Sequence, residues 1–69
     1  MKIDDIRKAL HRKPWRPVEF ILDSGDRFII EHIEDIAASF DDSRLLLFPN
    51  GQEIITTPDK ITAVRRVRK

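Results

Sequence analysis

Two glutamates, a histidine and an aspartate gather between residues 31 and 35, and these side-chain types hold metal ions or transfer protons. They are Glu31, His32, Glu34 and Asp35. Neighbouring residues of an extended segment point to opposite faces, and no second histidine stands at the spacing of a ligand pair. The chain also has no nucleophile elbow and no phosphate-binding glycine loop. We therefore interpret the cluster as a solvated turn and expect a protein that is not an enzyme, with no cofactor and no metal.

Basic side chains are the second group with chemistry to offer, because they contact phosphates. Residues 1–17 carry a net charge of +4 and residues 61–69 another +4, whereas residues 18–60 carry −7. The two basic termini either keep an acidic domain soluble or form one cationic surface for an anionic partner. Runs of charged residues more often serve solubility than binding. The residues of the cationic surface would be Lys13, Arg16, Arg65, Arg66, Arg68 and Lys69.

The only tryptophan, Trp15, stands between Pro14 and Pro17. An exposed indole would stack on a nucleic-acid base. The two prolines disfavour the helical conformation at the residues before them, so the segment predicts a stiff corner between a helix and a strand. We expect Trp15 to pack beneath that helix, near Leu10, as a structural plug.

Length and composition limit what the chain can be. Its 69 residues are enough for a single small domain, which buries only about 60% of the surface exposed by its unfolded chain. There is no cysteine to form a disulfide, and self-association is a common source of extra burial for small scaffolds. No apolar run approaches a membrane span, and the first ten residues carry acids where a signal peptide is apolar. We expect a cytoplasmic protein that forms homo-oligomers or binds a protein partner, without membrane contact.

The hydrophobic periodicity predicts mainly β structure with one N-terminal α-helix. Ile3, Ile6 and Leu10 recur at helical spacing, which predicts a helix over about 3–12. Alternating patterns predict strands at about 18–23, 27–32, 36–40, 44–48, 53–57 and 61–67. Short strands and tight turns favour a small, strongly bent antiparallel sheet or barrel of the Sm-like or SH3-like kind, and the alternative is an open sheet with the helix across one face.

Residue parity selects the first hairpin. A three-residue loop closed by Gly25 in the left-handed conformation pairs Phe20 with Phe28 and Val18 with Ile30. A two-residue loop would mix the faces instead, because a slip of one residue turns a strand over.

The second hairpin is expected to use the same kind of turn. With Gly51 in the left-handed conformation, Phe48 faces Gln52 and Leu46 faces Ile54. This register places these apolar side chains on the core side of the sheet.

Both faces of the second hairpin are apolar, however. Three further side chains, Leu45, Leu47 and Ile55, then lie on the opposite face. Either the N-terminal helix covers them or they form a subunit interface. The sequence thus predicts a non-enzymatic β module that acts through self-association or a protein partner, and the alternative function is RNA binding by a basic rim.

Over most of its length, the chain resembles a group of short, uncharacterised bacterial proteins common in planctomycetes. The matching residues are Ile3, Ile6, Arg7, Ala9, Leu10, Pro14-Trp15-Arg16-Pro17, Asp23-Ser24-Gly25 and His32-Ile33-Glu34. Trp15 stands where an aromatic residue is usual, and Ile33 where the group has a proline. The group has no assigned activity, so this resemblance implies a fold and not a function.

A more distant resemblance is to the Sm-like family, which includes the bacterial RNA chaperone Hfq. Residues 17–25 are similar to the first strand and turn of that fold, and residues 53–67 to its last two strands. The resemblance implies a ring-shaped oligomer that binds RNA. Residues 53–60 lack the histidine-containing RNA motif of Hfq, and residues 28–32 lack the glycine at which Sm strands bend.

Overall fold

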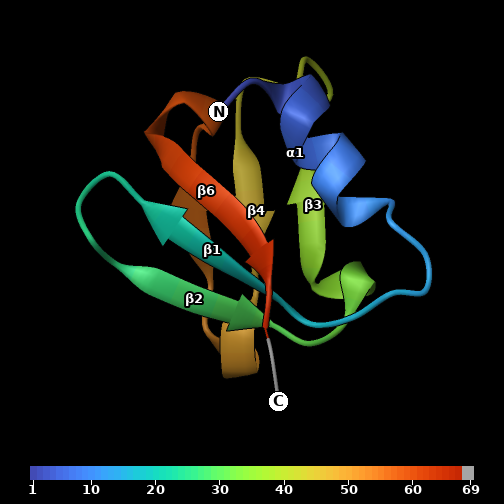
Figure 1. Ribbon diagram of the computed structural model, residues 1–69. Coiled ribbons are helices and arrows are strands. Elements are labelled where there is room, and N and C mark those ends of the chain that lie inside the picture. Colours follow the sequence, from blue (N-terminus) through green and yellow to red (C-terminus); the bar gives the residue numbers. More distant parts are fainter. Residues whose placement is uncertain (68–69) are drawn as a thin grey trace.

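Two three-stranded antiparallel sheets and one α-helix make up the fold (Figure 1). The computed structural model describes residues 1–67. One sheet has the strand order β2-β1-β6 and the other β3-β4-β5. The elements are α1 (Ile3–Leu10), β1 (Val18–Leu22), β2 (Arg27–Ile30), β3 (Ile36–Ala38), β4 (Leu45–Leu47), β5 (Ile54–Thr56) and β6 (Ile61–Arg66), with short 3-10 turns at Ile33–Asp35, Pro49–Gly51 and Pro58–Lys60. The prediction of a mainly β domain with one N-terminal helix is confirmed.

The sheets do not close into a barrel, so the expected barrel is wrong. Within residues 1–67 no strand pairing joins the two sheets. A strand that served both sheets would have to bend and continue, but β2 ends at Ile30 and a 3-10 turn intervenes before β3. Figure 1 shows the two sheets as separate layers, one in front of the other.

Helix α1 covers the side on which the two layers are open. It contacts β6 and lies beside β3 (Figure 1). Ile6 is fully buried and Leu10 nearly so, as their helical spacing requires. The helix ends at Leu10, two residues earlier than expected, and the His11 backbone N–H caps it by donating to the Arg7 carbonyl oxygen.

No helix in the described residues is long and apolar enough to cross a membrane.

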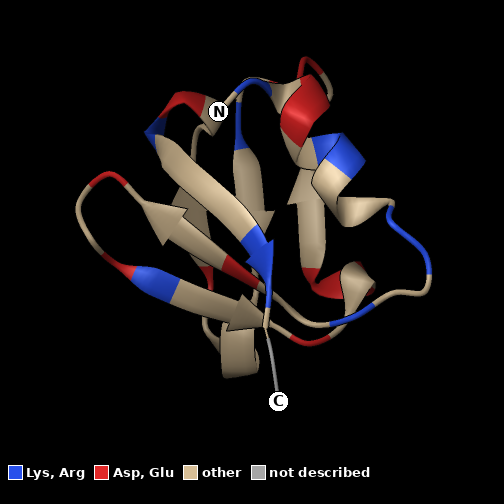
Figure 2. Ribbon diagram, viewed as in Figure 1, with Lys and Arg blue, Asp and Glu red and all other residues tan. Residues whose placement is uncertain are grey.

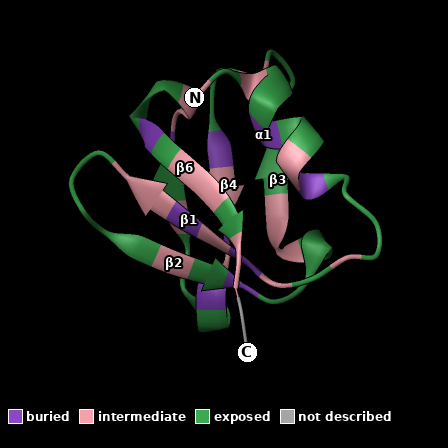
Figure 3. Cartoon of the chain, in the orientation of Figure 1, coloured by how far each residue is buried: buried purple, intermediate pink, exposed green. Residues whose placement is uncertain are grey.

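The hydrophobic core lies between the two sheets and the helix. Both layers and α1 contribute to it (Figure 3). Its buried residues are Ile6, Leu10, Val18, Phe20, Ile30, Leu45, Leu47 and Ile61.

The first hairpin has the predicted register. Val18 pairs with Ile30 and Phe20 with Phe28. Gly25 closes the loop with φ +92°, a conformation that favours glycine because it has no Cβ. Val18, Phe20 and Ile30 consequently reach the core together.

The second hairpin is one residue out of the predicted register. Leu46 pairs with Ile55, not with Ile54. The reason lies in the turn, where Asn50 and Gly51 both adopt positive φ, 50° and 78°. Asparagine tolerates this conformation better than most residues, and the loop is one residue longer than a turn with a single left-handed position.

This shift reverses the two faces of β4. Leu45 and Leu47 are 2% and 0% exposed and belong to the core, so their assignment to a subunit interface is wrong. They are covered within the chain by the other sheet and by α1. Ile55 is 61% exposed on the outer face, opposite Leu46.

Candidate nucleic-acid interface

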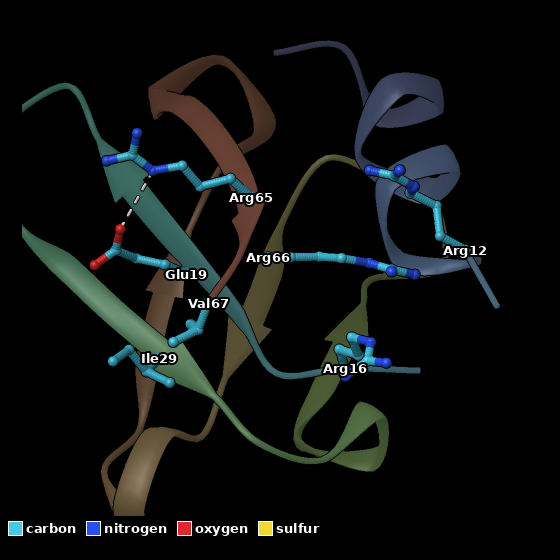
Figure 4. Close-up of a pocket in the computed structure, with 7 residues that line it drawn as sticks. All are labelled: Arg12, Arg16, Glu19, Ile29, Arg65, Arg66 and Val67. Carbon is cyan, nitrogen blue, oxygen red and sulfur yellow. Dashed lines mark hydrogen bonds and ion pairs between the residues drawn. The ribbon is translucent and has the colours of Figure 1, made fainter. Parts of the chain in front are cut away.

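A broad depression lies where the end of β6 meets the chain between α1 and β1 (Figure 4). Its volume is about 900 Å³. The residues that line it are Arg12, Arg16, Glu19, Ile29, Arg65, Arg66 and Val67. Arginine is the commonest residue in this lining, so the depression is an anion-attracting surface.

The proline corner and the antiparallel ladder bring these arginines together from opposite ends of the chain. Val18 pairs with Arg66, and the Val67 N–H donates to the Pro17 carbonyl at 3.0 Å, so the end of β6 runs alongside the corner. The Arg66 guanidinium donates to the Pro14 carbonyl oxygen at 3.0 Å, which orients its side chain toward the corner. Figure 2 shows the basic positions along the corner and at the end of β6, while many acidic positions lie in turns.

Three of the four arginines are electrostatically uncompensated. Arg12, Arg16 and Arg66 take part in no ion pair within residues 1–67. Like charges placed close together repel one another, and an anion that binds between them removes this repulsion. The arginine side of the depression can therefore accept phosphate, which guanidinium groups bind through paired N–H donors.

The other side of the depression is mixed in character. Arg65 Nε lies 3.4 Å from Glu19 Oε1, and the two residues are register partners on β6 and β1. Arg27 Nη1 lies 4.0 Å from the same oxygen. Ile29, the partner of Glu19 on β2, is 44% exposed and adds apolar surface together with Val67. Figure 4 shows Ile29 and Val67 close to the Glu19–Arg65 pair, with the remaining arginines opposite.

The structure unites half of the predicted basic residues. Arg16, Arg65 and Arg66 line the depression, and Lys13 is exposed nearby in sequence but does not line it. The predicted contacts Arg68 and Lys69 lie outside the described residues.

Sequence reasoning missed the other lining residues. Arg12 was expected inside the helix, and the earlier helix end at Leu10 places it on the corner instead. Glu19 and Ile29 alternate with the core residues of β1 and β2, so strand parity was the signal that could have placed them on the outer face.

The acidic and histidine cluster lies in the 3-10 turn after β2 and at its borders. Glu31, His32 and Glu34 are exposed there. The Asp35 backbone carbonyl accepts the Phe48 N–H at 2.9 Å, which ties the turn to the second hairpin. In the described part of the chain, no group of three such side chains is close enough together to hold a metal ion.

Trp15 has a structural position. It is partly buried against the core, and its indole Nε1–H donates to the Glu31 carbonyl oxygen at 2.9 Å. It is not among the residues that line the depression. These contacts agree with the plug interpretation.

Comparisons with protein-family models, curated proteins and solved structures found no match to this chain.

Proposed function

We propose that this protein binds single-stranded RNA by its phosphate backbone, through the arginine depression. The observation that carries the proposal is the convergence of Arg12, Arg16 and Arg66, which come from different segments and have no ion-pair partner within residues 1–67. Phosphate contacts of this kind give affinity without reading the sequence.

The size and lining of the depression favour a chain of nucleotides over a single phosphate group. A volume of about 900 Å³ is far larger than one phosphate fills. Next to the cations, the aliphatic surface of Ile29 and Val67 can be buried against the face of a base, so the lining suits a ligand with both charged and apolar parts. The net charge of the chain is only +1, so we expect modest affinity that depends on this local cluster.

RNA is preferred to DNA because residues 17–25 and 53–67 resemble strands of the Sm-like family, which binds RNA. The two sheets here do not form a closed barrel, and the chain lacks the histidine-containing motif of Hfq, so the proposed contacts are those of the arginine depression. We also propose a cytoplasmic location. RNA is available there, and a chain without cysteine has no disulfide that the reducing environment could break.

The test is a salt titration of RNA binding. Fluorescence anisotropy of a labelled, unstructured RNA of about 12 nucleotides is followed at about 50 mM and about 200 mM salt. We expect binding at low salt and a steep loss of affinity at high salt. No binding at the lower salt concentration, or binding that salt leaves unchanged, would contradict the proposal.

A second candidate function is association through the outer face of the second sheet. Ile55 is 61% exposed and lies directly opposite Leu46, which is half-buried. Contiguous exposed apolar patches mark interaction surfaces, and these two side chains are neighbours on the sheet. Light scattering after size-exclusion chromatography would show an oligomer that Ile55→Lys converts to a monomer. A wild-type monomer would exclude self-association at this face.

A further inference from the structure

We infer that Glu19 gives the depression a base preference, for RNA bases with an exocyclic amino group over uracil. The inference rests on the proposed RNA binding and assigns a specificity-determining residue to the same depression. Among residues 1–67, Glu19 is the only acidic residue that lines it.

The position of Glu19 is fixed by the sheet. It lies on β1, the central strand, with Ile29 opposite it on β2 and Arg65 opposite it on β6. Its side chain is 21% exposed, so a ligand can reach it although its neighbours restrict its movement.

The two oxygens of the Glu19 carboxylate have different surroundings. Arg65 Nε and Arg27 Nη1 both approach Oε1, at 3.4 and 4.0 Å. Within residues 1–67, Oε2 accepts no hydrogen bond. The two arginines thus approach one oxygen of the carboxylate and leave the other free to accept a hydrogen bond from a ligand.

The residues around Glu19 can hold a nucleotide base so that its edge meets Oε2. Ile29 and Val67 offer apolar surface beside it for the face of a base (Figure 4). Arg12, Arg16 and Arg66 stand on the other side of the depression for the phosphates. One strand of RNA can therefore present its backbone to the arginines and a base to Glu19 at the same time.

The hydrogen-bonding groups on the edge of each base determine whether a carboxylate can bind it. An ionised carboxylate has only acceptors. Cytosine presents an N4 amino group, and acidic side chains pair with it in protein–nucleic acid complexes. Uracil has a carbonyl oxygen in place of the amino group, and its N3–H donor lies between two carbonyl oxygens, both of which repel the carboxylate. Cytosine and uracil have the same ring size and differ only in these edge groups, so the pair tests what the carboxylate accepts without a change in stacking area.

The experiment compares labelled oligo(C) and oligo(U) RNAs of equal length at the same low salt concentration. We expect the wild type to bind oligo(C) at least about threefold more tightly than oligo(U), the effect of one hydrogen bond at an exposed position. In Glu19→Gln this ratio should fall to about one, because the amide offers a donor as well as an acceptor. The variant should also bind both RNAs more tightly, because one negative charge is lost.

Glu53→Gln is the matched control. It removes the same charge from an exposed residue that does not line the depression, so the ratio should stay at the wild-type value. Equal binding of both RNAs by the wild type, or an unchanged ratio in Glu19→Gln, would overturn the base preference and leave backbone binding standing. Absence of binding to either RNA would overturn both proposals.

Discussion

Replacing Arg16 by glutamine tests the arginine depression most directly. Arg16 lies on the corner, makes no ion pair or side-chain hydrogen bond within residues 1–67, and lines the depression. The substitution therefore removes a phosphate contact without removing a contact that holds the fold together.

The magnitude follows from the number of uncompensated arginines. For single-stranded nucleic acid, the logarithm of the binding constant changes with the logarithm of salt by about −0.7 for each neutralised phosphate. Three contacts, from Arg12, Arg16 and Arg66, give a slope of about −2. Between about 50 and 200 mM salt, the affinity of the wild type should then fall about 20-fold. In Arg16→Gln the slope should be about −1.4 and the fall about sevenfold.

The assay is the anisotropy titration repeated at several salt concentrations for both proteins. Arg44→Gln serves as the control, because Arg44 is exposed and does not line the depression. Its slope should equal that of the wild type. Equal slopes for Arg16→Gln and the wild type would refute the assignment of Arg16 to the phosphate contacts.

Three predictions concern stability. Leu47→Ala should lower the free energy of unfolding by about 2–5 kcal/mol, because it leaves a core cavity. Ile55→Ala should change the free energy of unfolding by less than about 0.5 kcal/mol, because Ile55 is exposed. If urea denaturation gave the reverse order, it would contradict the β4–β5 register. Gly25→Ala should cost about 1–2 kcal/mol in the same assay, because its φ of +92° is unfavourable for alanine, and no cost would mean that the loop can rearrange. Hydrogen bonds from Ser43, above all from its hydroxyl, lower the pKa of Asp41 from 3.8 to about 2. Because the unfolded chain binds the proton more readily, this contribution to stability is complete above about pH 4 and is lost as the pH falls toward 2; carbon NMR of the carboxyl group should show the low pKa, and a value near 3.8 would show that the turn does not hold.

Local turn chemistry explains both the success and the failure of the hairpin predictions. In the first hairpin, Gly25 is the only glycine and is the residue best suited to a positive φ, so loop length and register followed from the sequence. In the second, Asn50 and Gly51 are adjacent and both are suited to it, and the choice between one and two left-handed positions changes the register. The hydrophobic pattern could not decide, because Leu45, Leu46 and Leu47 allow either face to be buried.

The depression could be predicted only in part, because it depends on contacts between distant segments. The segregation of charge toward both ends pointed to Arg16, Arg65 and Arg66 as a joint surface. The inclusion of Glu19 depends on the pairing of β1 with β6, which local periodicity does not specify.

The pairing of β1 with β6 has a kinetic consequence for the proposed binding of RNA where the two strands meet. All of β3, β4 and β5 lie within the loop that this pairing closes. Closing such a loop costs entropy before other contacts compensate it, and contacts between distant segments of this kind slow the folding of small domains. Arg16 precedes β1 and Arg66 ends β6, so an RNA strand bound to both side chains would connect the two segments from outside. Such a ligand would oppose the first separation of the strands, and we expect the bound protein to unfold more slowly than the free one.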